Sequence, residues 1–487
     1  MKASRFLASV VVLSVVLSAA VGALCAEPPK LPSGPPGPGR FGAAYAHLKF
    51  TPEWDSPWRV GNHPDVVVRF DDGGHRFVFW RGTSFIPCWV NDKGVWYTNE
   101  FVERRGAHSP NTEGCVEPMS DKQCRFSHVR IIESNDARVV VHWRYAPIDV
   151  RYEHPFEDPL TGWHDWVDEY YTIYPDAVGV RTITAQTTRP DMWMEFQEAI
   201  VVNQPGTLPD DNIDHEAVSL CNMSGESKTY LWTRERGGPE FEGPEDCNIM
   251  LVNLKGRLQT FAISAPPQND ERLITPYGGR NRRSESHFNW WDHWPVSQVA
   301  SDGRGATSAA RPSHSSLAHI GLANPDAWGD YNRGETWRTK IMLHGLTEKP
   351  VEGLLPLTKS WIRPAPISVS LGYLSATYDP TQLAYVITRR GNAPGMAGDG
   401  KVHNVPFASE LTLELAASTE SPAINPALVI KGWGERDAEL TLNGNKVERG
   451  KDFRLGHSHG LEGTDLIVWI RTESMRPIKL TLSPVGD

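Results

Sequence analysis

The stretch "ARVVVHWRY", residues 137–145, decides the fold class. Side chains alternate between the two faces of a strand, and this stretch sorts its residues accordingly. The apolar side holds Val139, Val141 and Trp143, and the other side holds Val140, His142 and Arg144. The pattern predicts a strand that covers a core with one face and carries polar groups on the other.

Several other stretches before residue 205 have the same β-branched and aromatic texture. They are "DVVVRF" (65–70), "HRFVFWRG" (75–82), "SHVRIIES" (127–134), "DEYYTIYPDAVGVRTITAQT" (168–187) and "EFQEAIVVNQ" (195–204). Within the fourth, "YPDAVGV" is typical of a hairpin turn. No long amphipathic helix interrupts them, and one short helix is expected within residues 348–364. We therefore predict an all-β protein whose residues 45–364 form a large antiparallel β-sandwich.

Residues 365–487 have the texture of a second, smaller unit. "ELTLELAAS" (410–418), "ALVIKGWG" (427–434) and "TDLIVWIRT" (464–472) read as short strands, and "LNGNKV" (442–447) contains an Asn-Gly hairpin signal. The pattern predicts a small C-terminal Ig-like β-sandwich.

The N-terminus predicts export. Residues 1–26 combine Lys2 and Arg5 with an apolar run and small residues, which is typical of a signal peptide. The Pro/Gly-rich residues 27–44 are expected to form a linker. The mature chain is then secreted or periplasmic, and no later stretch is apolar enough to span a membrane. Of six cysteines, Cys25 lies in this signal, and the other five are expected mainly as free thiols, with Cys115/Cys124 and Cys221/Cys247 as alternative pairs.

The net charge restricts the class of ligand that the protein can bind. The net charge is −10 and no basic block is present, which argues against nucleic acid. An acidic protein binds an anionic ligand only through a local cluster of Arg, Lys and His. Eighteen tryptophans, many beside charged or amide residues, suit stacking on sugar rings. The expected partner is an acidic polysaccharide or oligosaccharide.

The chemistry-bearing residues gather in "HFNWWDHWPVSQVASDGRGATSAARPSHSSL", residues 287–317. No strand or helix period runs through it, so a long ordered loop lining a sugar cleft is expected. The candidate substrate-binding residues are Arg81, Asn289, Trp291, Trp294, Gln298 and His314. Arg81 is included because it ends a strand before a Gly-Thr-Ser turn.

Two reactions fit these groups. β-Elimination on a uronic acid needs a neutraliser for the carboxylate, a base and an acid. The neutraliser is Arg304 with Asn289 or Gln298, and the base is His293. His142 is a second candidate base if its strand face lines the cleft. The acid is Tyr331 or a tyrosine of "DEYYTIY".

Glycoside hydrolysis instead needs two carboxylates, and the candidates are Glu100, Glu169, Glu195, Asp292 and Asp302. The abundance of His, Arg and Asn over Glu in residues 287–317 favours elimination, because Arg suits anionic substrates. A glycan-binding protein without catalytic activity is the third alternative.

No catalytic cofactor is expected. A structural zinc or calcium ion on His287, Asp292 and His293 is the alternative, although no spacing is diagnostic. "DDNIDHEAVSLC" (210–221) opens like a calcium loop but has His215 where glycine is required and Cys221 where glutamate is required.

The signal peptide, the β-rich body, the Trp/His/Arg-rich segment and the small terminal sandwich together resemble secreted bacterial β-sandwich polysaccharide lyases. The resemblance extends over residues 45–487 and is one of architecture. It implies cleavage of an acidic polysaccharide by β-elimination. The chain departs from many lyases in having no helical toroid.

Overall fold

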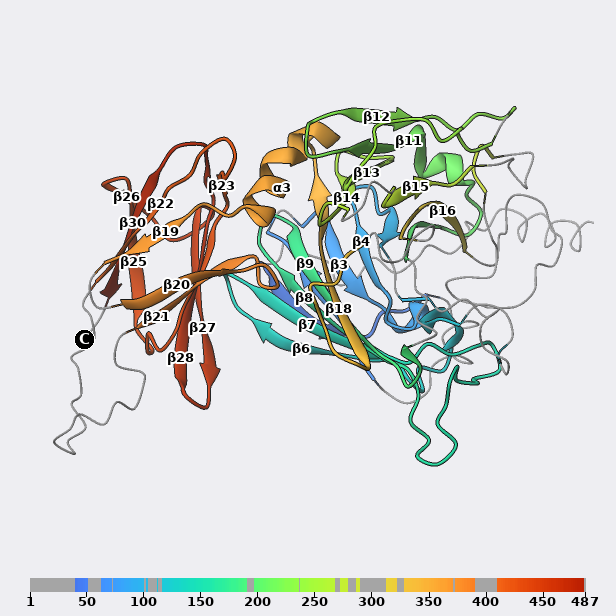
Figure 1. The fold of residues 1–487 in the computed structure, drawn as a ribbon, viewed down its shortest axis with the longest axis horizontal. Helices are drawn as coiled ribbons and strands as arrows, with labels where there is room; N and C mark the ends of the chain where they lie inside the picture. The colour runs from blue at the N-terminus through green and yellow to red at the C-terminus, as the bar shows by residue number, and fades with distance from the viewer. Residues whose placement is uncertain are drawn as a thin grey trace, which may run out of the picture.

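The computed structural model describes residues 40–50, 63–71, 73–99, 102–103, 112, 116–190, 197–235, 237–267, 272–278, 286–289, 312–321, 328–370, 373–389 and 410–485. Within these ranges nearly all regular structure is antiparallel β-sheet, arranged as two sandwich-like units side by side (Figure 1). The prediction of an all-β sandwich protein is confirmed.

The first unit pairs two large sheets. The eight-stranded sheet has the order β1 (Gly42–Ala46), β2 (Asp65–Arg69), β3 (Arg76–Phe79), β4 (Pro87–Val90), β5 (Trp96–Thr98), β10 (Gln197–Asn203), β16 (Ser313–Ile320) and β15 (Ile274–Pro276). The ten-stranded sheet has the order β12 (Ser227–Tyr230), β11 (Ile213–Cys221), β13 (Ile249–Leu254), β14 (Gln259–Ser264), β18 (Trp337–Thr347), β9 (Val178–Gln186), β8 (Trp166–Ile173), β7 (Val139–Tyr145) and β6 (His128–Ser134), with β17 (Asn332–Arg333) paired to β18.

The alternation expected in 137–145 is present in β7. Val139, Val141 and Trp143 are fully buried in the core between the two sheets. The polar side chains of β7 therefore lie on the outer face of the ten-stranded sheet. The predicted turn also forms, because Tyr174 and Val178 close the hairpin between β8 and β9 with a hydrogen bond of 2.9 Å.

A buried ion pair joins two adjacent strands, β8 and β9, inside the core of the first unit. Arg181 on β9 donates from Nε and Nη2 to the two carboxylate oxygens of Glu169 on β8, each at 2.6 Å. Tyr145 and Tyr171 donate to the same carboxylate, at 2.7 and 2.5 Å. Glu169 was a candidate carboxylate for hydrolysis, and that prediction is wrong, because the group is fully buried and already saturated with donors.

The second unit is a smaller sandwich of two sheets. One has the order β19 (Ile367–Val369), β22 (Leu411–Leu415), β30 (Ile478–Val485), β25 (Asp437–Leu442) and β26 (Asn445–Val447); the other has β20 (Tyr373–Asp379), β21 (Ala384–Arg389), β24 (Ala427–Ile430), β28 (Gly463–Ile470) and β27 (Phe453–Gly460). A short pair joins β23 (Ala423–Ile424) to β29 (Glu473–Ser474). The predicted Asn-Gly hairpin links β25 and β26, with positive φ at Asn443 and Gly444.

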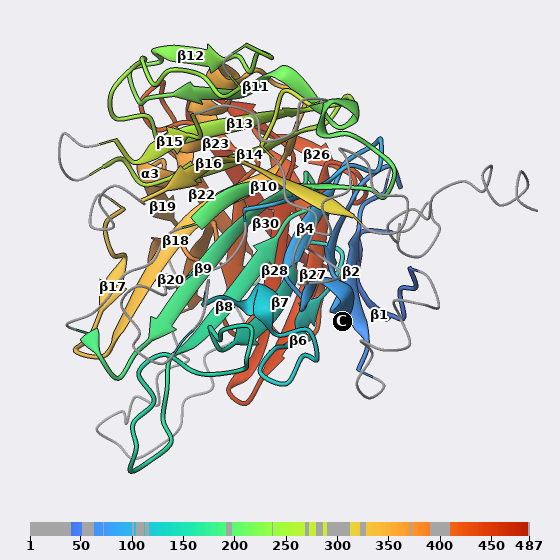
Figure 2. The same cartoon turned by 90° about the vertical axis from the view of Figure 1, so that its right-hand side faces the viewer.

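The units pack through apolar and polar contacts. Ala137 and Tyr174 from the first share a buried cluster with Val429 and Trp469 from the second. The predicted short helix is α3 (Leu355–Ile362), preceded by the 3₁₀ turn η7 (Val351–Leu354), and it packs on the upper outer face of the ten-stranded sheet. Figure 2 shows the first unit from the side, with β6 to β9 lying next to one another below β11 and β13.

One expectation about residues 287–317 is wrong. Residues 313–317 do not belong to a loop, because they are part of β16 (Ser313–Ile320), a fully buried strand of the eight-stranded sheet. The strand is rich in serine and histidine, so it lacks the apolar run that marks a buried strand in sequence. Ser315 accepts a hydrogen bond from Asn203 and Ser316 donates to Glu198, which satisfies both hydroxyls inside the protein.

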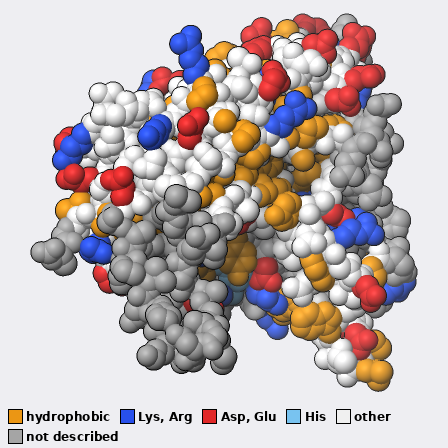
Figure 3. Space-filling model, turned by 60° about the vertical axis from the view of Figure 1, so that its left-hand side comes forward, with side chains coloured by type: hydrophobic (Ala, Val, Ile, Leu, Met, Phe, Trp, Pro, Cys, Tyr) orange, Lys and Arg blue, Asp and Glu red, His pale blue; other side chains and the backbone are white. Residues whose placement is uncertain are grey.

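The charged side chains on one face of the protein and the state of the cysteines can be compared with the sequence predictions. On the face in Figure 3 the Lys and Arg side chains are scattered, several Asp and Glu side chains lie together at the upper right, and hydrophobic side chains gather in the middle. An anionic ligand would therefore be recognised by a local group of cations. Cys88, Cys124, Cys221 and Cys247 are free, and Cys115 lies outside the described residues. Within the described ranges, no helix combines the length and the hydropathy needed to span a bilayer.

Candidate functional site

The outer face of β6, β7 and β8 gathers basic and aromatic side chains. Pairing places Arg130 opposite His142 and His142 opposite Tyr170, while one row further along Arg144 lies between His128 and Asp168. Directly opposed residues on one face are about 4.5–5.5 Å apart at Cβ, so these side chains touch. We name this surface the basic face, and its members are His128, Arg130, His142, Arg144, Trp166, Asp168 and Tyr170.

His142 is the fixed centre of the basic face. Its Nε2 lies 2.7 Å from Asp168 Oδ1, and its Nδ1 accepts a hydrogen bond of 3.2 Å from Arg130 Nε. Tyr170 stacks on the imidazole with ring centroids 4.5 Å apart. Because Nδ1 accepts, Nε2 carries the proton and donates it to Asp168. Both nitrogens are engaged and the residue is buried, so His142 positions its neighbours and has no lone pair open to a ligand.

Asp168 is held as an anion between two donors. Arg144 Nη1 donates to both of its oxygens, at 3.1 and 2.9 Å. Burial would raise the pKa of this carboxyl, but the hydrogen bond from His142 and the charge of Arg144 hold it below its usual value. Asp168 therefore neutralises Arg144 and not Arg130.

Arg130, His128 and Tyr170 are the groups that the basic face offers outward. Arg130 is exposed and has no carboxylate partner among the residues that the structure describes. His128 is exposed at the surface, but its imidazole is partly desolvated by its neighbours, and this together with the charges of His142, Arg130 and Arg144 lowers its pKa. Tyr170 is 41% exposed. The face thus offers a cation, a neutral imidazole and a phenol within two strands of one another.

A cavity of about 390 Å³ adjoins the basic face. Its lining includes His128, Arg144, Trp166, Arg125 and Phe126. The Arg144 guanidinium lies over the Trp166 ring, 4.7 Å from its centroid. A volume in this range accommodates a small ligand such as one or two sugar rings, with an aromatic wall for stacking.

The other predicted site residues lie in separate parts of the first unit. Tyr331 is exposed next to β17, and its backbone N–H donates to Thr339 O on β18. Thr339 pairs with Thr184 on β9, which pairs with Asp168 on β8, so Thr339 is two strands from Asp168. Tyr331 therefore lies one strand beyond Thr339, about 14 Å from Asp168 across the sheet and away from the basic face. Arg81 is buried in the 3₁₀ turn η1 (Arg81–Thr83), where its backbone N–H donates to Asp65 Oδ1 at 2.7 Å. That position ties down the turn.

The remaining predictions concern residues 287–317. His314 is buried in β16, on the other sheet. Asn289 is half-buried next to the buried Phe288. His293, Arg304, Trp291, Trp294 and Gln298 lie outside the described residues, as do Glu100, Glu195, Asp292 and Asp302, so their roles stay predictions. The structure does not bring His142 together with any of these groups that it describes.

Sequence reasoning missed a buried carboxyl cluster on the eight-stranded sheet. Glu198 on β10 accepts hydrogen bonds from Tyr277 and, at 2.7 Å, from Ser316 on β16. Burial raises the pKa of Glu198. Burial followed by the nearby charges of Glu103 and Glu198 raises the pKa of Glu117 well above its usual value. No sequence spacing could indicate this cluster, because its members come from segments far apart in the chain.

Comparisons with known proteins give little at the level of sequence. Neither a protein-family model nor a curated protein matches the chain. Among solved structures, a galactose 1-epimerase from Lactobacillus acidophilus NCFM is similar at 8% identity and a TM-score of 0.29, covering 64% of this chain and 100% of that one. A GalM/aldose epimerase homologue from C. elegans has 8% identity, a TM-score of 0.23 and coverages of 56% and 96%. Similarity this low carries no argument about activity, which must rest on the residues of the chain itself.

Proposed function

We propose that the protein is an exported lyase that binds an acidic polysaccharide on the basic face and cleaves it by β-elimination. The observation that carries the proposal is the juxtaposition of Arg130, His128 and Tyr170 on one sheet face beside an aromatic-walled cavity. Export rests on the N-terminal residues 1–26 alone.

Each group has one role in the proposed reaction. Arg130, which has no carboxylate partner among the described residues, binds the uronate carboxylate and withdraws charge from it, which makes the C5 proton acidic. A ring nitrogen of His128 accepts that proton, and a C4–C5 double bond forms as the C4–oxygen bond breaks. Tyr170 donates its hydroxyl proton to the departing oxygen. Proton exchange with water then returns His128 and Tyr170 to their starting forms.

The fixed part of the site supports these roles. His142 orients Arg130 through its Nδ1 and stacks under Tyr170, and Asp168 holds His142 in the required tautomer. Arg130 and Tyr170 lie on strands separated only by β7, so their backbones are about 10 Å apart and one sugar unit can span them. Trp166 beyond them carries the Arg144 guanidinium over its ring and lines the adjoining cavity, where the next unit can bind.

Hydrolysis is the second candidate function, and one observation favours it. Glu117 and Glu198 lie near each other with raised pKa values, and a protonated carboxyl beside a second one is what a general acid in glycoside hydrolysis requires. Glu117 is buried and Glu198 is half-buried among the described residues, whereas Arg130, His128 and Tyr170 of the basic face are exposed, and this ranks elimination first.

The test is incubation of the mature chain with a panel of uronic-acid polysaccharides. Ultraviolet absorbance from the new double bond and the number of reducing ends are recorded together. Elimination gives both signals, hydrolysis gives reducing ends alone, and a binding protein gives neither. Absorbance that persists in His128→Ala and Tyr170→Phe would remove the basic face from the chemistry, and His459→Ala, an exposed histidine of β27, is the matched control.

A further inference from the structure

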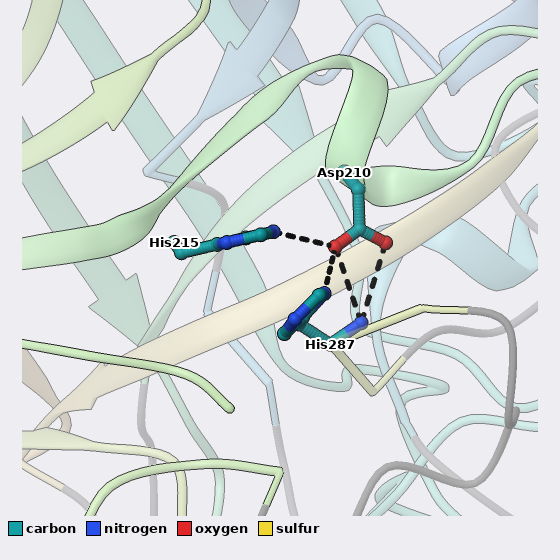
Figure 4. A group of neighbouring side chains, drawn as sticks. All are labelled: Asp210, His215 and His287. Atoms are coloured by element: carbon teal, nitrogen blue, oxygen red, sulfur yellow. Dashed lines mark hydrogen bonds and ion pairs between the residues drawn. The ribbon is translucent and has the colours of Figure 1, made fainter. Parts of the chain in front are cut away.

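Three ligand-type side chains outside the basic face meet at one point (Figure 4). They are Asp210 in the 3₁₀ turn η5 (Pro209–Asp211), His215 in β11 and His287 in the segment 286–289. Asp210 Oδ1 lies 3.0 Å from His215 Nε2 and 2.5 Å from His287 Nδ1. One ligand atom from each residue falls within 4.8 Å of the others.

We propose that Asp210, His215 and His287 bind one zinc ion. Two imidazoles and one carboxylate form a donor set that zinc uses in sites with three protein ligands and a water molecule. Calcium fits poorly, because it prefers oxygen ligands. This site was not expected from the sequence, which grouped His287 with Asp292 and His293.

The distances require little movement on binding. With zinc–ligand bonds of about 2.0–2.1 Å, tetrahedral ligand atoms lie about 3.3 Å apart. The two nitrogen–oxygen distances here are 3.0 and 2.5 Å, so each imidazole needs to move away from Asp210 by less than about 1 Å, and the two imidazole nitrogens already lie within 4.8 Å of each other. Zinc would take the place of the two imidazole protons that now point at Asp210 Oδ1, and its binding would release them.

The surroundings prepare the site. The His287 backbone N–H lies 3.3 and 3.2 Å from the two Asp210 oxygens, and Ser286 also donates to this carboxylate. Such outer contacts orient metal ligands. The His215 side chain is 45% exposed, against 19% for Asp210 and 17% for His287, so an ion has an open approach past His215.

A zinc ion here would connect parts of the chain that are distant in sequence. His287 is 77 positions from Asp210, and it is joined to η5 and β11 on the ten-stranded sheet by this cluster. The ion would fasten segment 286–289 to that sheet. Since the basic face lies on other strands, the proposal is independent of the lyase reaction and can succeed or fail without it.

The test is calorimetric titration of Zn²⁺ into the untagged, chelator-treated mature chain, with metal content measured after dialysis. We expect one zinc per chain, and at least 100-fold weaker binding in His215→Ala and Asp210→Asn, because each removes a ligand. Asp214→Asn is the matched control, since Asp214 precedes His215 and pairs with Lys255 instead. Co²⁺ in place of Zn²⁺ should give visible absorption bands that His215→Ala abolishes. Zinc binding that is absent, or equal in the wild type and His215→Ala, would overturn the proposal.

Discussion

Replacing Arg130 by alanine removes the outward cation of the basic face. Its guanidinium has no acidic partner among the described residues, so its charge is available to a ligand carboxylate. A hydrogen bond to a charged group contributes about 1.5–3 kcal/mol, which corresponds to about 10- to 100-fold in the dissociation constant. Because Arg130 is exposed and screened by solvent, we expect the lower end of that range at 0.15 M salt.

The assay is calorimetric titration with an acidic oligosaccharide at low and high ionic strength. Arg130→Ala should weaken binding by about tenfold and reduce its salt dependence, because one ionic contact is lost. Arg257→Ala is the matched control, because Arg257 is an exposed arginine that pairs with Glu348 at the far end of the sheet. Equal affinities of the wild type and Arg130→Ala would refute the role of Arg130. A comparable loss in Arg257→Ala would show that only net charge matters.

Three further outcomes are expected. Glu169→Gln leaves the fully buried Arg181 without its counter-ion, and urea unfolding should show a loss of about 3–5 kcal/mol in the free energy of unfolding. Burial lowers the pKa of His344 to about 3, so between about pH 6.5 and about pH 3 the unfolded chain binds a proton that the native chain does not. Stability should therefore fall with decreasing pH by up to about 1.4 kcal/mol per unit, and this contribution should disappear in His344→Gln, which keeps an acceptor for the Trp89 N–H. The lowered pKa of His128 predicts that the rising limb of kcat/KM against pH has a pKa below about 6.5, and a rising limb with a higher pKa would exclude His128 as the base.

Local pattern was enough to predict the strands. Period-two alternation placed Val139 and Trp143 in a core and His142 on the outer face, and the contacts of His142 with Arg130, Asp168 and Tyr170 confirm that division, although these neighbours also bury His142. β16 was not predicted as a strand, because the hydroxyls of Ser315 and Ser316 are hydrogen-bonded to Asn203 and Glu198, which lie more than 100 residues away in the sequence. Alternation reports which face a residue occupies but not which partner satisfies it.

The candidate sites depend on register, which sequence does not provide. Arg130 meets His142 through a hairpin with a bulge near Ile132, and His142 meets Asp168 only because β8 pairs with β7 in one register. A shift of one residue would turn these side chains to the other face. The zinc site likewise joins His287 to two residues of a segment far upstream, so a search for short spacings could not find it.

The most direct test of the central claim compares the rate of unsaturated product formation by the wild type and by His128→Ala on the polysaccharide that the wild type cleaves. We predict a loss of at least 100-fold in kcat with little change in substrate affinity, because general-base catalysis contributes about 10²–10⁴-fold and Arg130 still binds the carboxylate. An undiminished rate in His128→Ala would contradict it.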